Sequence, residues 1–115
     1  MNAVDPLDAF LGEGADEPVL MINLMRFRPD GGRERFARYM AAAAPLVRRH
    51  GGEFVHEGPA GPPVGGDAAL AWDHVVLVRY AHRRQFAALM RDPEYTAVNA
   101  LRLAAVSEAV VQPLH

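Results

Sequence analysis

Apolar residues follow two periods along the chain, and each period predicts one kind of element. Runs rich in apolar and β-forming residues predict strands at 19–27, 53–57, 72–80 and 109–114. Apolar positions at helical spacing predict helices at 33–50, 82–91 and 93–108. Residues 58–71, which begin with GPAGPPVGG, predict a long irregular loop.

The helix predicted at 33–50 has the clearest apolar stripe. Its inward positions are Phe36, Met40, Ala43 and Val47. Pro45 falls inside the same stretch, so we expect a kink or a tightened turn there. After the next helix, Asp92 followed by Pro93 is typical of a new helix start, because Asp caps free N–H groups and Pro suits the first turn.

The order of these elements predicts the fold class. A β-α-β-β-α-β order with the second helix broken in two favours an α+β, ferredoxin-like βαββαβ sandwich. Such a fold has a four-stranded antiparallel sheet with helices on one face. We expect an N-terminal arm at 1–17, loosely attached and with one helical turn near 6–11, followed by a single domain at 18–115.

Both faces of the predicted sheet carry apolar side chains, which predicts a partner for the face without helices. On the first strand Leu20, Ile22 and Leu24 alternate with Met21 and Met25. Because an apolar face needs a cover, we expect a homodimer formed through the sheet faces.

Composition narrows the possible functions. The chain has no cysteine, which excludes disulfides, thiolate metal sites and thiol catalysis. All 12 basic residues are arginine and the net charge is −2, so we expect no nucleic-acid partner and no Schiff-base lysine. No apolar run is long enough for a membrane span and the acidic start resembles no signal peptide, so we expect no membrane partner and a cytoplasmic location.

Three polar residues share one face of the helix predicted at 93–108. Tyr95, Asn99 and Arg102 have spacings of four and three residues, so their side chains lie on one side. Arg102 could hold an anion through its planar guanidinium, and Tyr95 could share or move a proton. Alternatively, Tyr95 packs at the sheet edge and Arg102 pairs with an acidic residue.

Four strand residues are further candidates. Asn23 interrupts an apolar strand, and its amide either contacts a ligand or satisfies a backbone group or a subunit contact. His74 could act as a general base, with Tyr80 on the same face as a ligand contact, or His74 could be a structural histidine. Arg26 could attract an anion at the strand end or be an ordinary solvated arginine.

Several segments together resemble the DUF1330 family, which belongs to the dimeric α/β barrel superfamily of ferredoxin-like folds. They are MINLMRFRP at 21–29, RRHGG at 48–52, WDHVVLVRY at 72–80 and RDPEYTAVNALR at 91–102. The resemblance implies a dimeric α/β barrel with a pocket between sheet and helices in each subunit, and it implies no particular reaction. Haem-degrading members of the superfamily carry a histidine in the helix that matches 93–108, where this chain has none, so we expect no haem.

Two functions follow as hypotheses. The first is an enzyme that performs acid–base or cofactor-free oxygen chemistry on a small anionic or aromatic metabolite, with His74 and Tyr95 catalytic. The substrate would then be bound by Asn23, Arg26, Tyr80, Asn99 and Arg102. The second is a non-catalytic ligand-binding or stress-related homodimer that uses the same pocket. No His or carboxylate spacing is typical of a metal site, and we expect no cofactor.

Overall fold

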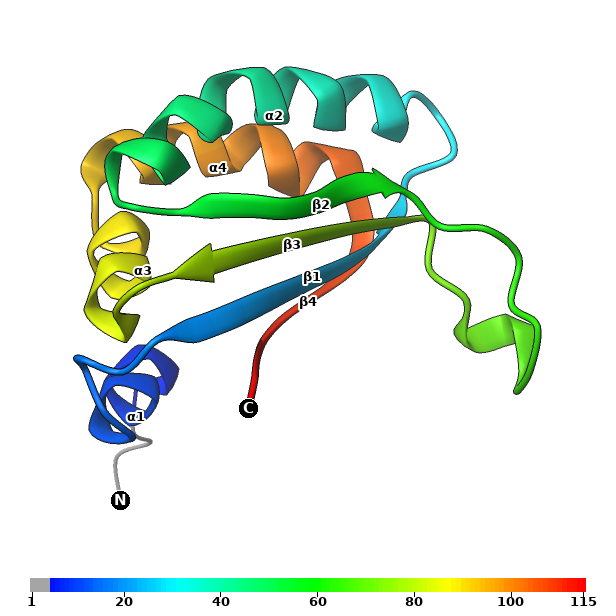
Figure 1. Cartoon of the computed structure of the whole chain (residues 1–115). Coiled ribbons are helices and arrows are strands. Elements are labelled where there is room, and N and C mark those ends of the chain that lie inside the picture. Colours follow the sequence, from blue (N-terminus) through cyan, green and yellow to red (C-terminus); the bar gives the residue numbers. More distant parts are fainter. Residues whose placement is uncertain (1–4) are drawn as a thin grey trace.

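A computed structural model describes residues 5–115 as a layer of helices on one face of a sheet (Figure 1). The strands are β1 (Val19–Phe27), β2 (Glu53–Pro59), β3 (His74–Tyr80) and β4 (Val106–Leu114). The helices are α1 (Pro6–Gly12), α2 (Gly32–Arg49), α3 (Arg83–Met90) and α4 (Pro93–Ala105), with a short 3₁₀ turn at Ala68–Leu70. The predicted ferredoxin-like α+β fold is therefore confirmed.

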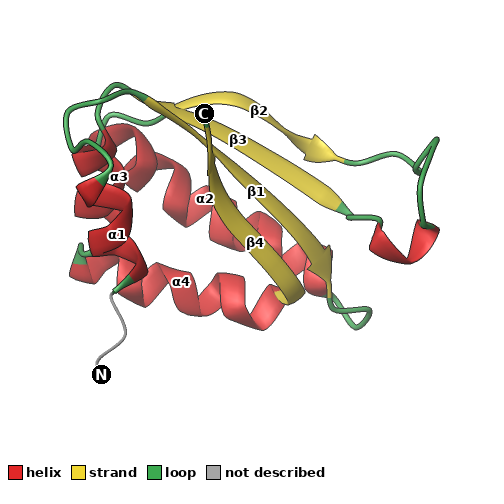
Figure 2. Cartoon of the chain, turned by 90° about the horizontal axis from the view of Figure 1, so that it is seen from below, coloured by secondary structure: helices red, strands yellow, loops and turns green. Residues whose placement is uncertain are grey.

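The sheet has the strand order β2-β3-β1-β4, and every pairing in it is antiparallel. The central strand β1 pairs Ile22 with Leu77 of β3 and with Gln112 of β4. Helices α2 and α4 lie across one face, while α3 and α1 stand together at one end (Figure 2). The other face carries no helix in the part of the chain that the structure describes.

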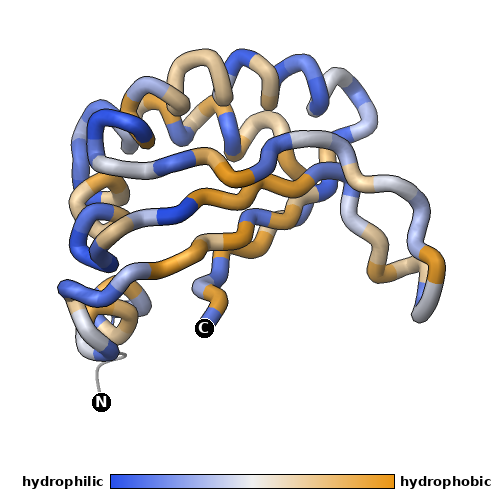
Figure 3. The backbone as a smooth tube through the Cα atoms, in the orientation of Figure 1, coloured by the Kyte–Doolittle hydropathy of each residue, from blue (hydrophilic) through white to orange (hydrophobic). Residues whose placement is uncertain are grey.

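The covered face of the sheet supplies half of the hydrophobic core. Met21 and Met25 of β1 and Val76 and Val78 of β3 are almost fully buried beneath the helices. The alternate residues Leu20, Ile22, Leu24, Val75, Leu77 and Val110 are only half-buried. Hydrophobic residues, coloured orange, consequently follow one another along β1 and β3, because the positions of both faces are apolar (Figure 3).

Helix α4 ends three residues earlier than the pattern predicts, so the prediction of a helix to 108 is wrong at its end. Val106 already has an extended backbone and pairs with Phe27 of β1. Pairing with the central strand therefore overrides the helical pattern of the sequence, since a β-branched residue suits a strand better than a helix end. The strand β4 is correspondingly longer than predicted.

The N-terminal segment is attached more firmly than the sequence indicates. Phe10 of α1 packs edge-on against Phe86 of α3, with ring centroids 5.6 Å apart. Asp8 pairs with Arg91 at 2.7 Å, and the guanidinium of Arg83 lies 4.6 Å from the Phe10 ring centre. The division into an arm and a domain remains a prediction, although these contacts join the two parts.

Candidate functional site

A cavity of about 480 Å³ lies between the sheet and the helices, at the end where α1 and α3 stand. We call it the outer chamber. Helix α1 forms one wall, α3 and α4 form another, and β1 and β4 form the floor. The lining residues are Asp5, Pro6, Leu7, Phe10, Met21, Asn23, Phe86, Met90, Tyr95, Asn99, Arg102, Val111 and Pro113.

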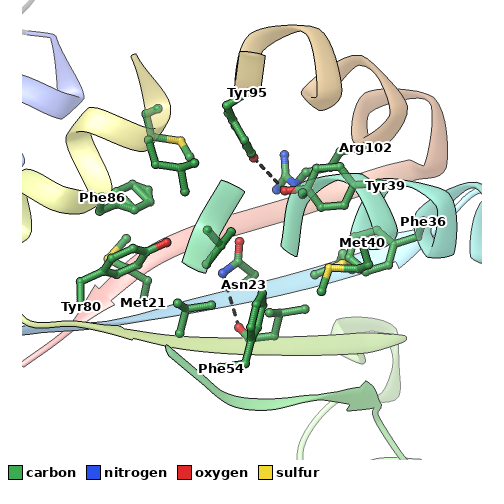
Figure 4. A pocket seen from close by; sticks show the side chains of 17 residues that line it. Met21, Asn23, Phe36, Tyr39, Met40, Phe54, Tyr80, Phe86, Tyr95 and Arg102 are labelled. Carbon is green, nitrogen blue, oxygen red and sulfur yellow. Dashed lines mark hydrogen bonds between the residues drawn. The ribbon is translucent and has the colours of Figure 1, made fainter. Parts of the chain in front are cut away.

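A smaller inner chamber of about 40 Å³ continues this cavity beneath α2 (Figure 4). The two chambers are adjacent because both are lined by Met21, Asn23, Phe86, Met90, Tyr95 and Arg102. The inner chamber is otherwise lined by Met25, Phe36, Tyr39, Met40, Ala43, Val47, Phe54, Val76, Val78, Tyr80 and Leu89. All three tyrosines of the chain and four of its five methionines therefore line this small space.

Helix α4 brings together the three polar residues that the sequence places on one face. Asp92 caps the helix by accepting a hydrogen bond from the Glu94 N–H at 2.9 Å, and Pro93 follows it. The hydrogen bond with His50 lowers the pKa of Asp92 below its usual range, and the hydrogen bond from the Glu94 N–H is the second-largest cause of this shift. The helix start is thus fixed, and Tyr95, Asn99 and Arg102 all line the outer chamber.

A hydrogen-bonded pair of tyrosines lies at the junction of the chambers. The hydroxyls of Tyr39 and Tyr95 are 2.8 Å apart (Figure 4). Tyr95 also donates to Oδ1 of Asn99 at 3.4 Å. Burial, and after it the nearby Tyr95, raises the pKa of both Tyr39 and Tyr80 well above the usual value. Both phenols therefore stay protonated at neutral pH and act as hydrogen-bond donors or acceptors, not as bases.

Arg102 is the only positively charged residue among those lining the two chambers in the described chain. Its side chain is half-buried, and within residues 5–115 it makes no ion pair and no hydrogen bond. Its charge reaches the buried Tyr39, where it opposes part of the rise in pKa. A guanidinium without a partner beside an apolar cavity is a ready site for an anion.

Asn23 occupies the floor of both chambers. Its Nδ2 donates to the carbonyl of Val76 at 3.4 Å, while its carboxamide oxygen points toward the cavity (Figure 4). The sequence left two roles open for Asn23, a hydrogen bond to the backbone and a contact with a ligand. One end of its carboxamide can serve each role, so the two are compatible. Tyr80 also directs its hydroxyl to this space, and that hydroxyl has no hydrogen-bond partner within residues 5–115.

His74 lies on the same covered face but away from the cavity. It packs 5.2 Å from the Phe36 ring centre and 5.4 Å from that of Phe27, and its Nε2 lies 3.2 Å from Oε1 of Glu57. It lines neither chamber. This position fits the structural alternative for His74 better than the catalytic one.

Arg26 lies on the helix-free side of the sheet. It donates to the carbonyls of Ala71 and Ala69 at 2.7 and 3.0 Å, pairs with Glu108 at 2.9 Å and stacks over Trp72. These contacts fasten the loop between β2 and β3 to the sheet. The structure thus keeps Arg26 apart from Asn23, Tyr80, Tyr95, Asn99 and Arg102, which it brings together around the cavity.

Sequence reasoning missed Tyr39 and the residues of α1. Tyr39 lies three residues after Phe36 and four before Ala43, so it belongs to the apolar stripe of α2. A tyrosine inside such a stripe was a usable signal, because a buried hydroxyl needs a partner. The roles of Leu7 and Phe10 as chamber walls depend on how α1 folds back onto α3, which no local pattern reveals.

Within residues 5–115, no three His, Asp or Glu side chains are grouped so that they could hold a metal ion. No helix in that same range has both the length and the apolar character to cross a membrane.

The fold and the cavity define a ferredoxin-like α+β protein with a pocket between sheet and helices. The profile of the family described as "Domain of unknown function (DUF1330)" matches residues 31–112, and the chain belongs to this family. The resemblance read from the sequence is therefore confirmed. No curated protein matches the chain in sequence.

Solved structures agree with this assignment. A protein of unknown function from Rhodopseudomonas palustris is 29% identical, with a TM-score of 0.85, over 99% of this chain and 96% of that one. A dimeric ferredoxin-like protein of unknown function from Jannaschia sp. CCS1 is 15% identical, with a TM-score of 0.70, over 85% and 98%. A NIPSNAP-like domain protein from Burkholderia xenovorans is 17% identical, with a TM-score of 0.60, over 87% and 85%. The last two show the fold alone.

Proposed function

We propose that the protein binds a small organic anion, most simply a carboxylate, in the two-chamber cavity, with the cytoplasm as the expected compartment. The observation that carries the proposal is the half-buried guanidinium of Arg102, which has no ion-pair partner within residues 5–115 and is the one positive charge among the described residues that line the two chambers. A carboxylate would supply the missing charge and accept two parallel hydrogen bonds.

Neighbouring groups would complete the anion site. Asn99 accepts from Tyr95 through its oxygen, which leaves its NH₂ group available to donate to a ligand. Partial burial of Arg102 would strengthen this contact relative to one on an exposed surface. The one acidic residue of the lining, Asp5, accepts a hydrogen bond from the Leu7 N–H at 2.8 Å at the start of α1.

The same lining favours binding over acid–base catalysis. Its ionisable residues are Asp5, Arg102 and the three tyrosines, and the pKa values of Tyr39 and Tyr80 are raised away from neutrality. A general base works best when its pKa lies near the working pH. His74, the base of the enzymatic hypothesis, lies outside both chambers, so the non-catalytic alternative is the function that we put forward.

Isothermal titration calorimetry with hexanoate, phenylacetate and inorganic phosphate tests the proposal. At least one of the carboxylates should bind, and Arg102→Ala should weaken its affinity roughly tenfold or more, since a hydrogen bond to a charged group contributes about 1.5–3 kcal/mol. Arg38→Ala is the matched control, because Arg38 is an exposed arginine of α2 that lines neither chamber. The proposal fails if no probe binds, or if both variants keep the parent affinity.

We also propose that a second copy of the chain covers the helix-free face of the sheet. Six aliphatic side chains lie half-buried there, and the Jannaschia protein with the same fold is dimeric. A face of this kind is the usual site of a subunit contact. The dimer would leave the cavity on the opposite face of each sheet.

A further inference from the structure

We propose that the ligand is an aliphatic monocarboxylate whose chain enters the inner chamber, so that this chamber selects ligands by chain length. The inference rests on the proposed function and names the class of ligand. Arg102 lies where the two chambers meet, because it lines both of them. A carboxylate held there has the inner chamber directly in front of its apolar end.

The walls of the inner chamber suit a flexible apolar chain. Met21, Met25, Met40 and Met90 all line it, and methionine side chains are unbranched and adapt their shape to a neighbour. Such walls can follow a chain that bends, whereas a rigid wall of branched residues would fit one shape only. On α2, which covers the chamber, Ala43 leaves space because its side chain is small, and it is 1% exposed.

The size of the inner chamber sets the expected chain length. A cavity needs a volume of about 10–15 Å³ to hold one water-sized group. The inner chamber has about 40 Å³, which corresponds to roughly three such groups before the walls must move. Butyrate, with three carbons beyond its carboxylate, should therefore fill the chamber as it stands, hexanoate should require the methionine side chains to move, and longer chains should gain nothing further.

Two polar groups of the chamber are already hydrogen-bonded, whereas the Tyr80 hydroxyl has no partner within residues 5–115. The Tyr39 hydroxyl is bonded to Tyr95, and Nδ2 of Asn23 is bonded to the carbonyl of Val76. Twelve of the seventeen lining residues are apolar, and the five polar ones are Asn23, Tyr39, Tyr80, Tyr95 and Arg102. An apolar chain can thus pass along the methionines while its carboxylate stays at the junction.

Calorimetric titration with the unbranched carboxylates from acetate to octanoate tests the inference, with the 1-alkanols of the same lengths as neutral probes. Affinity of the carboxylates should rise up to about fourfold for each added methylene and then level off near hexanoate. The alkanols should level off at the same length but bind more weakly, because they lack the contact with Arg102.

Two substitutions in the inner chamber should change, in opposite directions, the chain length at which affinity levels off. Ala43→Val reduces the space and should shift the limit to a shorter chain, whereas Met40→Ala enlarges it and should shift the limit to a longer chain. Val111→Ala is the control, because Val111 lines the outer chamber only. Should Ala43→Val fail to fold, Met40→Ala alone still decides the question.

The outcomes separate this inference from the proposed function. Carboxylates that bind through Arg102 with no dependence on chain length would overturn the inference and leave the anion site intact. A limit that moves with Val111→Ala instead of Met40→Ala would place the chain in the outer chamber and also overturn it. Carboxylates that bind no better than the alkanols would contradict the anion site itself.

Discussion

The two faces of the sheet are built from alternate residues of the same strands, yet they differ in what they offer. On the covered face Met25 is 1% exposed and Val78 4%, and the polar groups among them surround a cavity. On the open face Leu24 and Leu77 are half-buried and paired only with other strand residues. One face is covered by helices and borders a cavity, and the other carries no helix within residues 5–115.

This difference shows how a small domain can hold a cavity and an uncovered apolar surface on the two sides of one sheet. Alternation along a strand assigns each residue to one face, so the two surfaces can change independently. Asn23 and Leu24 are neighbours in sequence, but one lies on the cavity floor and the other points to the open side. Substitutions at such adjacent positions should therefore have unlike effects.

Truncation of Leu89 should produce the largest loss of stability. Leu89 is 2% exposed on α3, so Leu89→Ala should reduce the free energy of unfolding by roughly 2–5 kcal/mol. Leu24→Ala on the open face should reduce the free energy of unfolding by less. If a second copy covers that face, this reduction should depend on protein concentration. Denaturant unfolding at two concentrations measures both. Equal costs that do not change with concentration would remove the distinction between the faces.

A charge on the open face should separate the subunits. Leu24→Asp should raise the dimer dissociation constant about 30-fold or more, because it buries an unpaired carboxylate at the centre of the contact. Leu103→Asp on the exposed side of α4 is the control, since Leu103 is 57% exposed. Sedimentation velocity measures both variants. A dimer that tolerates Leu24→Asp would show that another surface forms the contact.

Loss of one tyrosine hydroxyl on the covered face should have a smaller effect. Tyr95→Phe leaves the Tyr39 hydroxyl without its partner at 2.8 Å and should reduce the free energy of unfolding by about 1–3 kcal/mol. The double variant Tyr39→Phe/Tyr95→Phe should reduce the free energy of unfolding by less than the sum of the two single changes, because neither hydroxyl of the pair is then left without the other. Strict additivity in a thermodynamic cycle would show that the pair is not coupled.

Alkaline titration should give the smallest but most specific signal. The folded pKa values of Tyr39 and Tyr80 lie above the unfolded value of about 10, so the unfolded chain loses these protons first. Stability is then complete below about pH 10 and falls as the pH rises above it. Absorbance at 295 nm should show that these two phenols ionise only when the protein unfolds. Tyr80→Phe and Tyr39→Phe assign the signal, and early ionisation of both would contradict their burial.

The sequence predicted most of the fold because the signals for it are local. Apolar periodicity placed β1 and α2 within one residue, and Asp92-Pro93 placed the start of α4 correctly. The end of α4 escaped prediction because Val106 follows a helical pattern but is drawn into the sheet by its pairing with Phe27. Such a choice between helix and strand depends on a partner that is distant in sequence.

The candidate site was predictable only in part, for the same reason. Helical spacing was enough to place Tyr95, Asn99 and Arg102 together. His74 and Tyr80 share one strand face, but alternation predicts the face and not the position along the strand. It therefore could not distinguish the end near Phe27, where His74 packs outside the cavity, from the end near Phe86, which lines it. Arg26 was assigned to the pocket although alternation with Met25 places it on the opposite side.

The absence of a loop between α4 and β4 has a mechanical consequence. Helix α4 ends at Ala105, β4 begins at Val106, and the N–H of Val106 donates to the carbonyl of Arg102. Arg102, which lines the cavity, and the edge strand β4 thus belong to one uninterrupted stretch of regular structure. A shift of β4 along β1 would therefore also displace the last turn of α4, which carries Arg102.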